Sequence, residues 1–245
     1  MEAKAALLAR IGAGPYTNAA KNVTRGKERG LPAACSRDKC RLVIHAGNPL
    51  VLGSASPRRR DFIASLGVPF VVRTAPVDET VLPGELPRAY VDRVTRAKLA
   101  GVQALDLGAA AGVLVADTVV VAPDGALLGK PRDDDHARSI LEQLAGDTHE
   151  VTTQFVLAPC SSGAPPSAAH AQATTTRVTF RRLSAGEIRA YVAGGEGRDK
   201  AGSYAIQGGA ASFVERIEGS FTNVVGLPLC EVVVALRALG WLATP

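Results

Sequence analysis

The sequence predicts a mixed α/β protein, and three observations support this class. From residue 49 onward, apolar runs typical of strands alternate with segments whose apolar residues recur at helical spacing. Glycines, prolines and helix-capping residues separate these segments at short intervals. A composition of 47% hydrophobic and 21% charged residues over 245 residues is typical of a globular protein with its own core. Strands and helices mix throughout without an internal repeat, so the class is α/β or α+β.

Residues 49–129 predict three strands that alternate with two helices. In order, these elements are a strand in 49–56, a helix over 57–66, a strand in 69–80, a helix over 88–105 and a strand with a hairpin in 112–129. Gly67 closes the first helix, because glycine readily adopts the backbone conformation found past helix ends. The apolar spacing of the second helix places Lys98 on it. Asp124–Gly125 is a typical hairpin turn.

The second half of the chain predicts three helices and three β segments. In order, these are a helix over 133–146, strands in 149–159 and 176–184, a helix over 184–192, a glycine-punctuated β segment in 202–228 and a helix over 228–239. Ser184 and Glu187 form a capping-box pattern, while Gly146 and Gly240 end the helices before them. Residues 159–174 are of low complexity and predict a mobile loop.

Positive charge is concentrated at the N-terminus. Residues 1–50 contain nine Lys and Arg against three acids, whereas the rest of the chain holds 19 basic and 20 acidic residues. The nearly neutral body gives poor support to a general nucleic-acid-binding face. Residues 1–40 are predicted to be a disordered basic extension. The alternatives are an upstream start codon or an organellar transit peptide, although serine richness and a clear amphipathic helix are missing.

The cysteines and the hydropathy pattern exclude two further classes. The four cysteines, 35, 40, 160 and 230, contain no C-x-x-C pair, which favours free thiols in a reducing compartment over a zinc site. No apolar stretch approaches the length of a membrane span. We therefore expect a cytoplasmic protein that binds neither a membrane nor nucleic acid, or an organellar one if the extension is a transit peptide.

The stretch VLGSASPRRR combines an apolar run, small residues and three arginines at a helix start. Ser56 is a suitable N-cap, and Pro57 suits the first helical position. Arginines at this end face the positive pole of the helix dipole, which disfavours them. A bound phosphate would relieve the conflict, since free amides, Ser54, Ser56 and the arginines Arg58 and Arg59 would form an anion cradle. The alternative is solvated arginines beside an ordinary cap.

Several acidic and basic residues are candidates for a cleft. Asp117 interrupts the apolar run VLVADTVVV, and could hold Mg²⁺ or accept a proton from water; alternatively it caps a turn. Lys130 follows the hairpin in LLGKPRD, where it could meet phosphate oxygens or simply be exposed. Asp78 and Glu79 in APVDET offer hard oxygen ligands, although acid pairs in loops are usually only solvated.

Six short motifs occur in order along the chain: SASPRR, VDE, RAK, ADTVVV, GKP and DKAGSYAIQG. With landmarks such as LAGDTHEV, VTFRRLSAGEI and FVERIEGSFTNVVGLPL, they resemble the Maf family of nucleoside triphosphate pyrophosphatases, also called septum-formation-inhibitor Maf-like proteins. The resemblance covers about residues 41–240 and predicts a Maf-like domain over residues 41–243. It implies a cytoplasmic enzyme that hydrolyses a nucleoside triphosphate to the monophosphate and pyrophosphate with a divalent cation, Mg²⁺ or Mn²⁺.

The resemblance also implies roles for individual residues. The matching positions are Asp117 as proton acceptor, Arg58 and Arg59 with Ser54 and Ser56 at the phosphates, Glu79, Lys98 and Lys130 in the cleft, and Arg58, Thr118 and Gln207 in base choice. Glu79 and Asp117 are the expected metal ligands. The implied fold resembles inosine triphosphate pyrophosphatases: a long mixed sheet flanked by helices, in two lobes around a cleft. Homodimers are common in the family, and residues 212–217 are a candidate contact.

By the same resemblance, Gln207 in SYAIQG implies the dTTP/UTP pyrophosphatase subfamily. Members that prefer 7-methyl-GTP carry glutamate there, and only an amide can both donate and accept hydrogen bonds. The sequence after Gln207, QGGAASF, has smaller side chains than usual, which could alter base preference. The alternatives are a 7-methyl-GTP or other modified-nucleotide house-cleaning pyrophosphatase and, in another class, a non-catalytic septum regulator.

Overall fold

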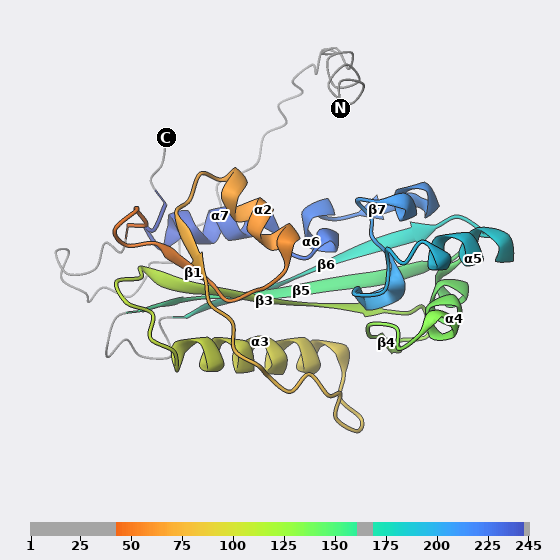
Figure 1. Cartoon of the computed structure of the whole chain (residues 1–245), viewed down its shortest axis with the longest axis horizontal. Coiled ribbons are helices and arrows are strands. Elements are labelled where there is room, and N and C mark those ends of the chain that lie inside the picture. Colours follow the sequence, from red (N-terminus) through yellow and green to blue (C-terminus); the bar gives the residue numbers. More distant parts are fainter. Residues whose placement is uncertain (1–42, 161–168, 243–245) are drawn as a thin grey trace, which may run out of the picture. The chain divides into compact units, whose positions relative to one another are not determined.

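A seven-stranded mixed sheet organises the part of the chain that the computed structural model describes, residues 43–160 and 169–242 (Figure 1). The strands are β1 (Leu50–Leu52), β2 (Phe70–Val72), β3 (Gly112–Val121), β4 (Leu127–Leu128), β5 (Thr148–Pro159), β6 (His170–Phe180) and β7 (Val214–Glu218). They follow the order β2-β1-β3-β5-β6-β7, with β4 paired to β3. β1 is parallel to β2 and β3, and the remaining pairs are antiparallel.

The five predicted helices are confirmed, with ends that differ by at most two residues. They are α2 (Pro57–Ser65), α3 (Pro87–Gln103), α4 (Asp134–Leu144), α5 (Ala185–Ala193) and α7 (Leu229–Ala238). The capping box predicted at Ser184 and Glu187 is present on α5. Gly67, Gly146 and Gly240 all have positive φ, as their positions past helix ends require.

Two groups of helices cover opposite ends of the long strands and form two lobes (Figure 1). In the first lobe, α2 and α7 pack on one face of β1, β3 and β5, and α3 packs on the other. In the second lobe, α4 and α5 pack on the far ends of β3, β5 and β6. The predicted class, a long mixed sheet flanked by helices in two lobes, is confirmed.

Two local predictions were wrong. Residues 170–174, placed in the 159–174 loop, belong to β6, where the pairs Leu157↔His170 to Thr153↔Thr174 extend the β5–β6 ladder. Their low complexity hid a strand rich in threonine, a residue favoured in sheets. Residues 161–168 of that loop lie outside the described residues, as does the predicted extension over 1–40.

The glycine-punctuated β segment over 202–228 also differs from the prediction. It consists of 3₁₀ turns at Ala201–Ser203 and Gly209–Phe213, strand β7 and a short helix α6 (Phe221–Val225). Gly202, Gly219 and Gly226 have positive φ, which interrupts a continuous strand. Only β7 pairs with the sheet, at its edge. Among the described residues, no helix is both long and apolar enough to cross a membrane.

Candidate active site

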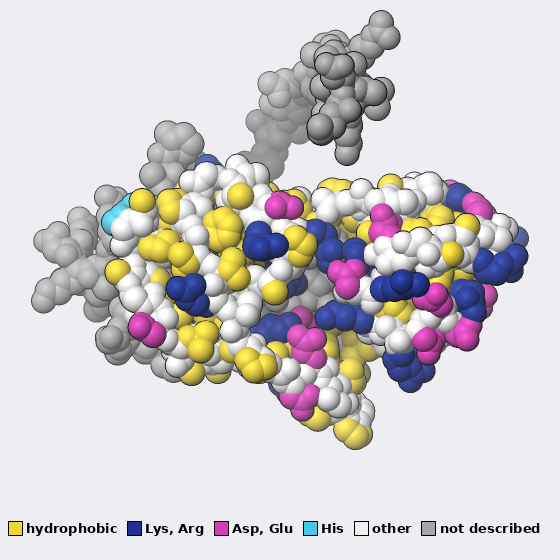
Figure 2. Space-filling view, viewed as in Figure 1, with side chains coloured by type: hydrophobic (Ala, Val, Ile, Leu, Met, Phe, Trp, Pro, Cys, Tyr) yellow, Lys and Arg dark blue, Asp and Glu magenta, His cyan; other side chains and the backbone are white. Residues whose placement is uncertain are grey.

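A cavity of about 740 Å³ lies between the two lobes. Its wall includes every residue predicted for the site: Ser54, Ser56, Arg58, Arg59, Glu79, Lys98, Asp117, Thr118, Lys130 and Gln207. Figure 2 shows basic and acidic side chains gathered around the hollow between the lobes. The fold therefore assembles in one place residues that are spread over most of the sequence.

The cavity opens on a stretch of β3 that lacks a strand partner on one side. β1 pairs with β3 only as far as Leu114, and β4 pairs with it only from Val120, so residues 115–119 have an open edge. Successive residues of a strand point to opposite faces. Asp117 accordingly faces α3 while Thr118 faces α2 and α6. Because the edge is open, both side chains reach the same cavity.

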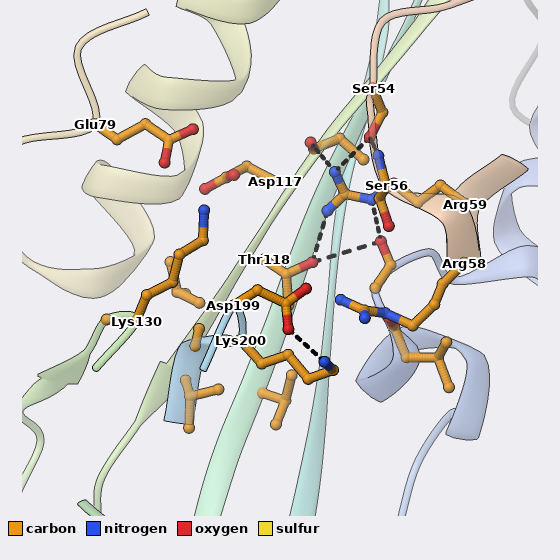
Figure 3. Close-up of a pocket in the computed structure, with 18 of the residues that line it drawn as sticks. Ser54, Ser56, Arg58, Arg59, Glu79, Asp117, Thr118, Lys130, Asp199 and Lys200 are labelled. Atoms are coloured by element: carbon orange, nitrogen blue, oxygen red, sulfur yellow. Dashed lines mark hydrogen bonds and ion pairs between the residues drawn. The ribbon is translucent and has the colours of Figure 1, made fainter. Parts of the chain in front are cut away.

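Three charged groups meet at Asp117. Lys98 Nζ on α3 lies 2.6 Å from Asp117 Oδ1 and 2.7 Å from Glu79 Oε1. Asp117 is only 8% exposed, so the ammonium offsets the cost of burying its charge. Lys130, which follows β4, extends toward the same two carboxylates (Figure 3). This cluster contains the predicted proton acceptor, both predicted metal ligands and both predicted lysines.

The loop that carries Glu79 is held against α3. The Tyr90 hydroxyl on α3 donates a hydrogen bond to the Glu79 carbonyl at 2.9 Å. Burial of Glu79 raises the pKa of its carboxyl, but hydrogen bonding to Lys98 and the charges of Lys98 and Lys130 outweigh this, and the pKa lies below its ordinary value. Burial and the nearby carboxylates raise the pKa of Tyr90 to about 12. Asp78 instead accepts a hydrogen bond from the Thr80 amide and is not on the cavity wall.

Arg59 points into the protein rather than into open space. Its Nε donates to the Gly226 carbonyl at 2.7 Å, and Nη1 donates to the Ala116 carbonyl at 2.8 Å and to Ser54 Oγ at 3.2 Å. Nη2 donates to Thr118 Oγ1 at 3.0 Å. Four of the five N–H groups of a guanidinium are thus engaged by the protein. Burial lowers the pKa of Arg59, and the charge of Asp117 opposes that effect.

Arg58, Ser54 and Ser56 make fewer side-chain hydrogen bonds to the protein than Arg59 does. The Arg58 guanidinium makes a single hydrogen bond within the described residues, from Nε to the Val225 carbonyl at 3.3 Å, and it lines the cavity. Ser56 occupies the N-cap of α2, but its side chain makes no capping hydrogen bond. Ser54 Oγ accepts from the Ser56 amide at 3.3 Å instead. The anion cradle predicted from these residues therefore has Arg58 and Ser56 as its accessible side chains.

Gln207 is exposed on a loop that Glu196 anchors. The Glu196 carboxylate accepts hydrogen bonds from the Gly209 amide at 3.0 and 3.1 Å. A Cβ on Gly208 would collide with that carboxylate, which explains the first glycine after the glutamine. The Tyr191 hydroxyl accepts from the Ala205 amide at 3.0 Å on the other side. The loop backbone is thereby fixed while the Gln207 side chain is left toward the cavity.

Sequence reasoning assigned no role to three polar residues that line the cavity, Tyr90, Asp199 and Lys200. Lys200 Nζ donates to Asp199 Oδ1 at 2.5 Å and to the Glu196 carbonyl at 2.6 Å. Hydrogen bonding to Lys200 lowers the pKa of Asp199. For Asp199 and Lys200, the available signal was their position at the start of the motif DKAGSYAIQG. With them, the wall carries five cations (Arg58, Arg59, Lys98, Lys130, Lys200) and three anions (Glu79, Asp117, Asp199).

The carboxylates of the cavity suit a divalent cation only if a bound ligand supplies further oxygen atoms to it. Within the described ranges, no group of three His, Cys, Asp or Glu side chains converges on a point. Glu79 and Asp117 do face a common position, which Lys98 Nζ fills. Mg²⁺ is commonly bound by one or two carboxylates together with substrate phosphates, and two carboxylates meet that requirement. The residues therefore fit a metal that arrives with a phosphate-bearing ligand.

The chain is similar to several named proteins over most of its length. It is 48% identical to a dTTP/UTP pyrophosphatase of Hahella chejuensis, over 79% of this chain and 96% of that protein. It is 50% identical to a dTTP/UTP pyrophosphatase of Anaeromyxobacter dehalogenans, over 78% of this chain and 94% of that one. Among solved structures, the Staphylococcus aureus Ham1 protein matches with a TM-score of 0.36 and 12% identity, covering 54% of this chain and 72% of that chain.

A family model described as "Maf-like protein" matches residues 49–239. That range contains both lobes, the open edge of β3 and every residue predicted for the site. On this match, and on relatives that it resembles over nearly their whole length, the chain belongs to the Maf family.

Proposed function

We propose that the protein hydrolyses dTTP and UTP to the nucleoside monophosphate and pyrophosphate. The convergence of Asp117 with the cations on the cavity wall carries this proposal. Five cations against three anions give the wall an excess of two positive charges, which complements a magnesium–triphosphate complex of about two negative charges. The names of the relatives supply the substrate class.

Asp117 is the group that accepts a proton in this reaction. One oxygen, Oδ1, is held by Lys98, while Oδ2 makes no hydrogen bond within the described residues. A water that donates to Oδ2 is directed at the α-phosphorus of a nucleotide whose triphosphate lies along the cations. A bond forms from the water oxygen to the α-phosphorus, and the proton of the water passes to Asp117. The bond between the α-phosphorus and the oxygen that bridges to the β-phosphorus breaks. Pyrophosphate leaves with the electron pair.

The cations stabilise the charge that builds up on the phosphate oxygens. Lys98 and Lys130 lie beside the carboxylates, and Arg58 lies at the start of α2. Their charges are in place before the substrate arrives, so they stabilise the developing charge without having to reorganise. Glu79 and Asp117 would hold the divalent cation, which neutralises phosphate charge when bound.

Base recognition is assigned to Gln207 and Thr118, which line the same cavity. The exposed Gln207 side chain offers both the carbonyl and the NH₂ of its amide. An amide can pair with the alternating acceptors and donor of a uracil or thymine edge, which suits dTTP and UTP.

A nucleotide panel tests the proposed function. Purified protein is incubated with dTTP, UTP, dCTP, dGTP and 7-methyl-GTP in Mg²⁺ or Mn²⁺, and released pyrophosphate is measured. We expect dTTP and UTP to be the best substrates. Activity confined to purine nucleotides would contradict the assignment of Gln207. No activity on any member of the panel would favour the non-catalytic regulator.

A further inference from the structure

The segment SFTNVVGLPL has no catalytic role in the proposed mechanism, yet two of its backbone carbonyls accept hydrogen bonds from the arginines of the site. The Gly226 carbonyl accepts from Arg59 Nε and the Val225 carbonyl accepts from Arg58 Nε. Gly226 has a φ of 125°, and a Cβ there would lie 3.7 Å from both Arg59 Nε and Thr118 Oγ1. The turn after α6 is therefore shaped to bring two carbonyls against the start of α2.

The position of this turn depends on Asn223, which is completely buried. Its Oδ1 accepts from the Thr153 amide at 3.1 Å, and its Nδ2 donates to the Val151 carbonyl and to Thr176 Oγ1, both at 2.9 Å. The whole amide is thus satisfied by β5 and β6. Apolar contacts have no preferred direction, but hydrogen bonds do. These bonds therefore fix the position of α6 on the sheet.

A directed chain of hydrogen bonds joins Asn223 to Arg59. Arg59 Nη2 donates to Thr118 Oγ1, which lies 2.8 Å from Thr153 Oγ1, and Thr153 Oγ1 donates to the Asn223 carbonyl at 3.1 Å. Because the Thr153 hydroxyl gives its one proton to the Asn223 carbonyl, it can only accept from Thr118. The other acceptor near Thr118 Oγ1, the Gly226 carbonyl, lies farther away at 3.5 Å. The Thr118 proton is therefore directed at Thr153.

We propose that Thr153 and Asn223 are positioning residues of the active site, although neither is on the cavity wall. Through this chain they hold the half-buried Arg59 as an anchor and keep Thr118 in one orientation. Arg58, whose remaining N–H groups make no hydrogen bond in the described part of the chain, is then the arginine that contacts the triphosphate. This assignment gives the two adjacent arginines different roles at the phosphates, where the family resemblance implied the same role for both.

The substitution Thr153→Val tests the chain, because it removes the hydroxyl and nearly preserves the shape. Thr152→Val is the matched control. Thr152 is the neighbouring residue on β5, points to the opposite face, and loses a comparable bond to Thr175 Oγ1 at 2.8 Å. Thr153→Ser keeps the hydroxyl and should restore the chain.

Two readouts separate positioning from a general loss of stability. The first is dTTP hydrolysis, which rests on the proposed function; the second is calorimetric titration with inorganic tripolyphosphate and Mg²⁺, which does not. We expect Thr153→Val to raise KM and the tripolyphosphate Kd by about tenfold, with a smaller change in kcat. Thr152→Val should lower Tm by a similar amount and leave KM and Kd within about twofold of the wild type.

The outcomes distinguish the two proposals. Equal effects of Thr153→Val and Thr152→Val on KM and Kd would refute the positioning role, as would a Thr153→Ser variant that behaves like Thr153→Val. If the wild type hydrolyses no nucleotide but Thr153→Val alone weakens tripolyphosphate binding, the positioning role stands and the proposed function fails.

Discussion

Adjacent residues with the same side chain have opposite environments at the start of α2. Both line the cavity, but Arg59 donates four hydrogen bonds to the protein and Arg58 donates only one. The unfavourable position of arginines near a helix N-terminus is thus resolved in two ways. Buried carbonyls and hydroxyls compensate Arg59, and we assign a bound anion to Arg58.

Asp117→Asn removes the proposed proton acceptor with almost no change of shape. We expect kcat for dTTP to fall about 10³-fold, since general-base catalysis typically contributes that much. Pyrophosphate release measured at saturating dTTP gives the comparison. Asp124→Asn is the control, because Asp124 caps the distant hairpin turn with an oxygen that asparagine retains. Near-normal turnover by Asp117→Asn would exclude this residue as the proton acceptor.

Lys98 fills the position between the two proposed metal ligands, so it should compete with a cation for them. Lys98→Met is expected to bind Mn²⁺ about tenfold more tightly without nucleotide, because an adjacent positive charge is removed. Electron paramagnetic resonance of free Mn²⁺ during titration measures this. Arg96→Met, on the same helix and paired with Asp92, should not change Mn²⁺ affinity. Weaker Mn²⁺ binding by Lys98→Met would show that the lysine supports the metal site.

At the scale of elements, local signals predicted the helices better than the β segments. The α4 and α5 ends are set by Asp133, by the capping box and by Gly146, all of which act within a few residues. Strand β6 was hidden because threonine and alanine between 170 and 176 give no clear alternation, and its partner β5 determines its start. The 202–228 segment depends on contacts such as that of Glu196 with Gly209, which no local pattern reveals.

The strand β5 carries a buried histidine that should make stability depend on pH. Burial lowers the pKa of His149 to about 4 from 6.5, and the charge of Asp147 opposes this only in part. Between these values the unfolded chain binds a proton that the folded protein does not, so stability falls as pH falls. The full loss would be about 3 kcal/mol.

Urea denaturation of the wild type and His149→Gln measures this loss between about pH 7 and about pH 4.5. The wild type should lose more stability than the variant over this range, since carboxylates titrate in both proteins. The hydrogen bond between His149 Nε2 and the Tyr204 hydroxyl, 2.8 Å long, changes the absolute stability but not this difference. Parallel curves for the two proteins would show that His149 titrates normally in the fold.

At the scale of the molecule, the cavity wall takes residues from both lobes. Ser54 and Lys98 come from the first lobe, Lys130 and Gln207 from the second, and β3 runs between them. A ligand that contacts both lobes therefore stabilises the whole described unit rather than one half. The predicted homodimer contact, residues 212–217, overlaps edge strand β7, and the dimer itself stays a prediction.

A non-hydrolysable dTTP analogue with Mg²⁺ should raise the single Tm of the protein. At a concentration of about 100 times Kd, the gain is about 2.7 kcal/mol, or about 5–10 °C for a protein of this size. Differential scanning calorimetry measures the shift and shows whether one transition is retained. Two transitions, only one of which shifts with ligand, would mean that the lobes unfold independently.

The sequence by itself determined the class of fold, five of the helices and the family, and it predicted ten residues that line one cavity. It did so because capping, periodicity and ordered motifs are local properties of the chain. Only the tertiary structure decided that the edge of β3 stays open between β1 and β4, so that Asp117 and Thr118 reach one cavity from opposite faces. It also decided that Arg59 is held by four hydrogen bonds and Arg58 by one, because their carbonyl partners Gly226 and Val225 lie more than 160 positions away in the chain.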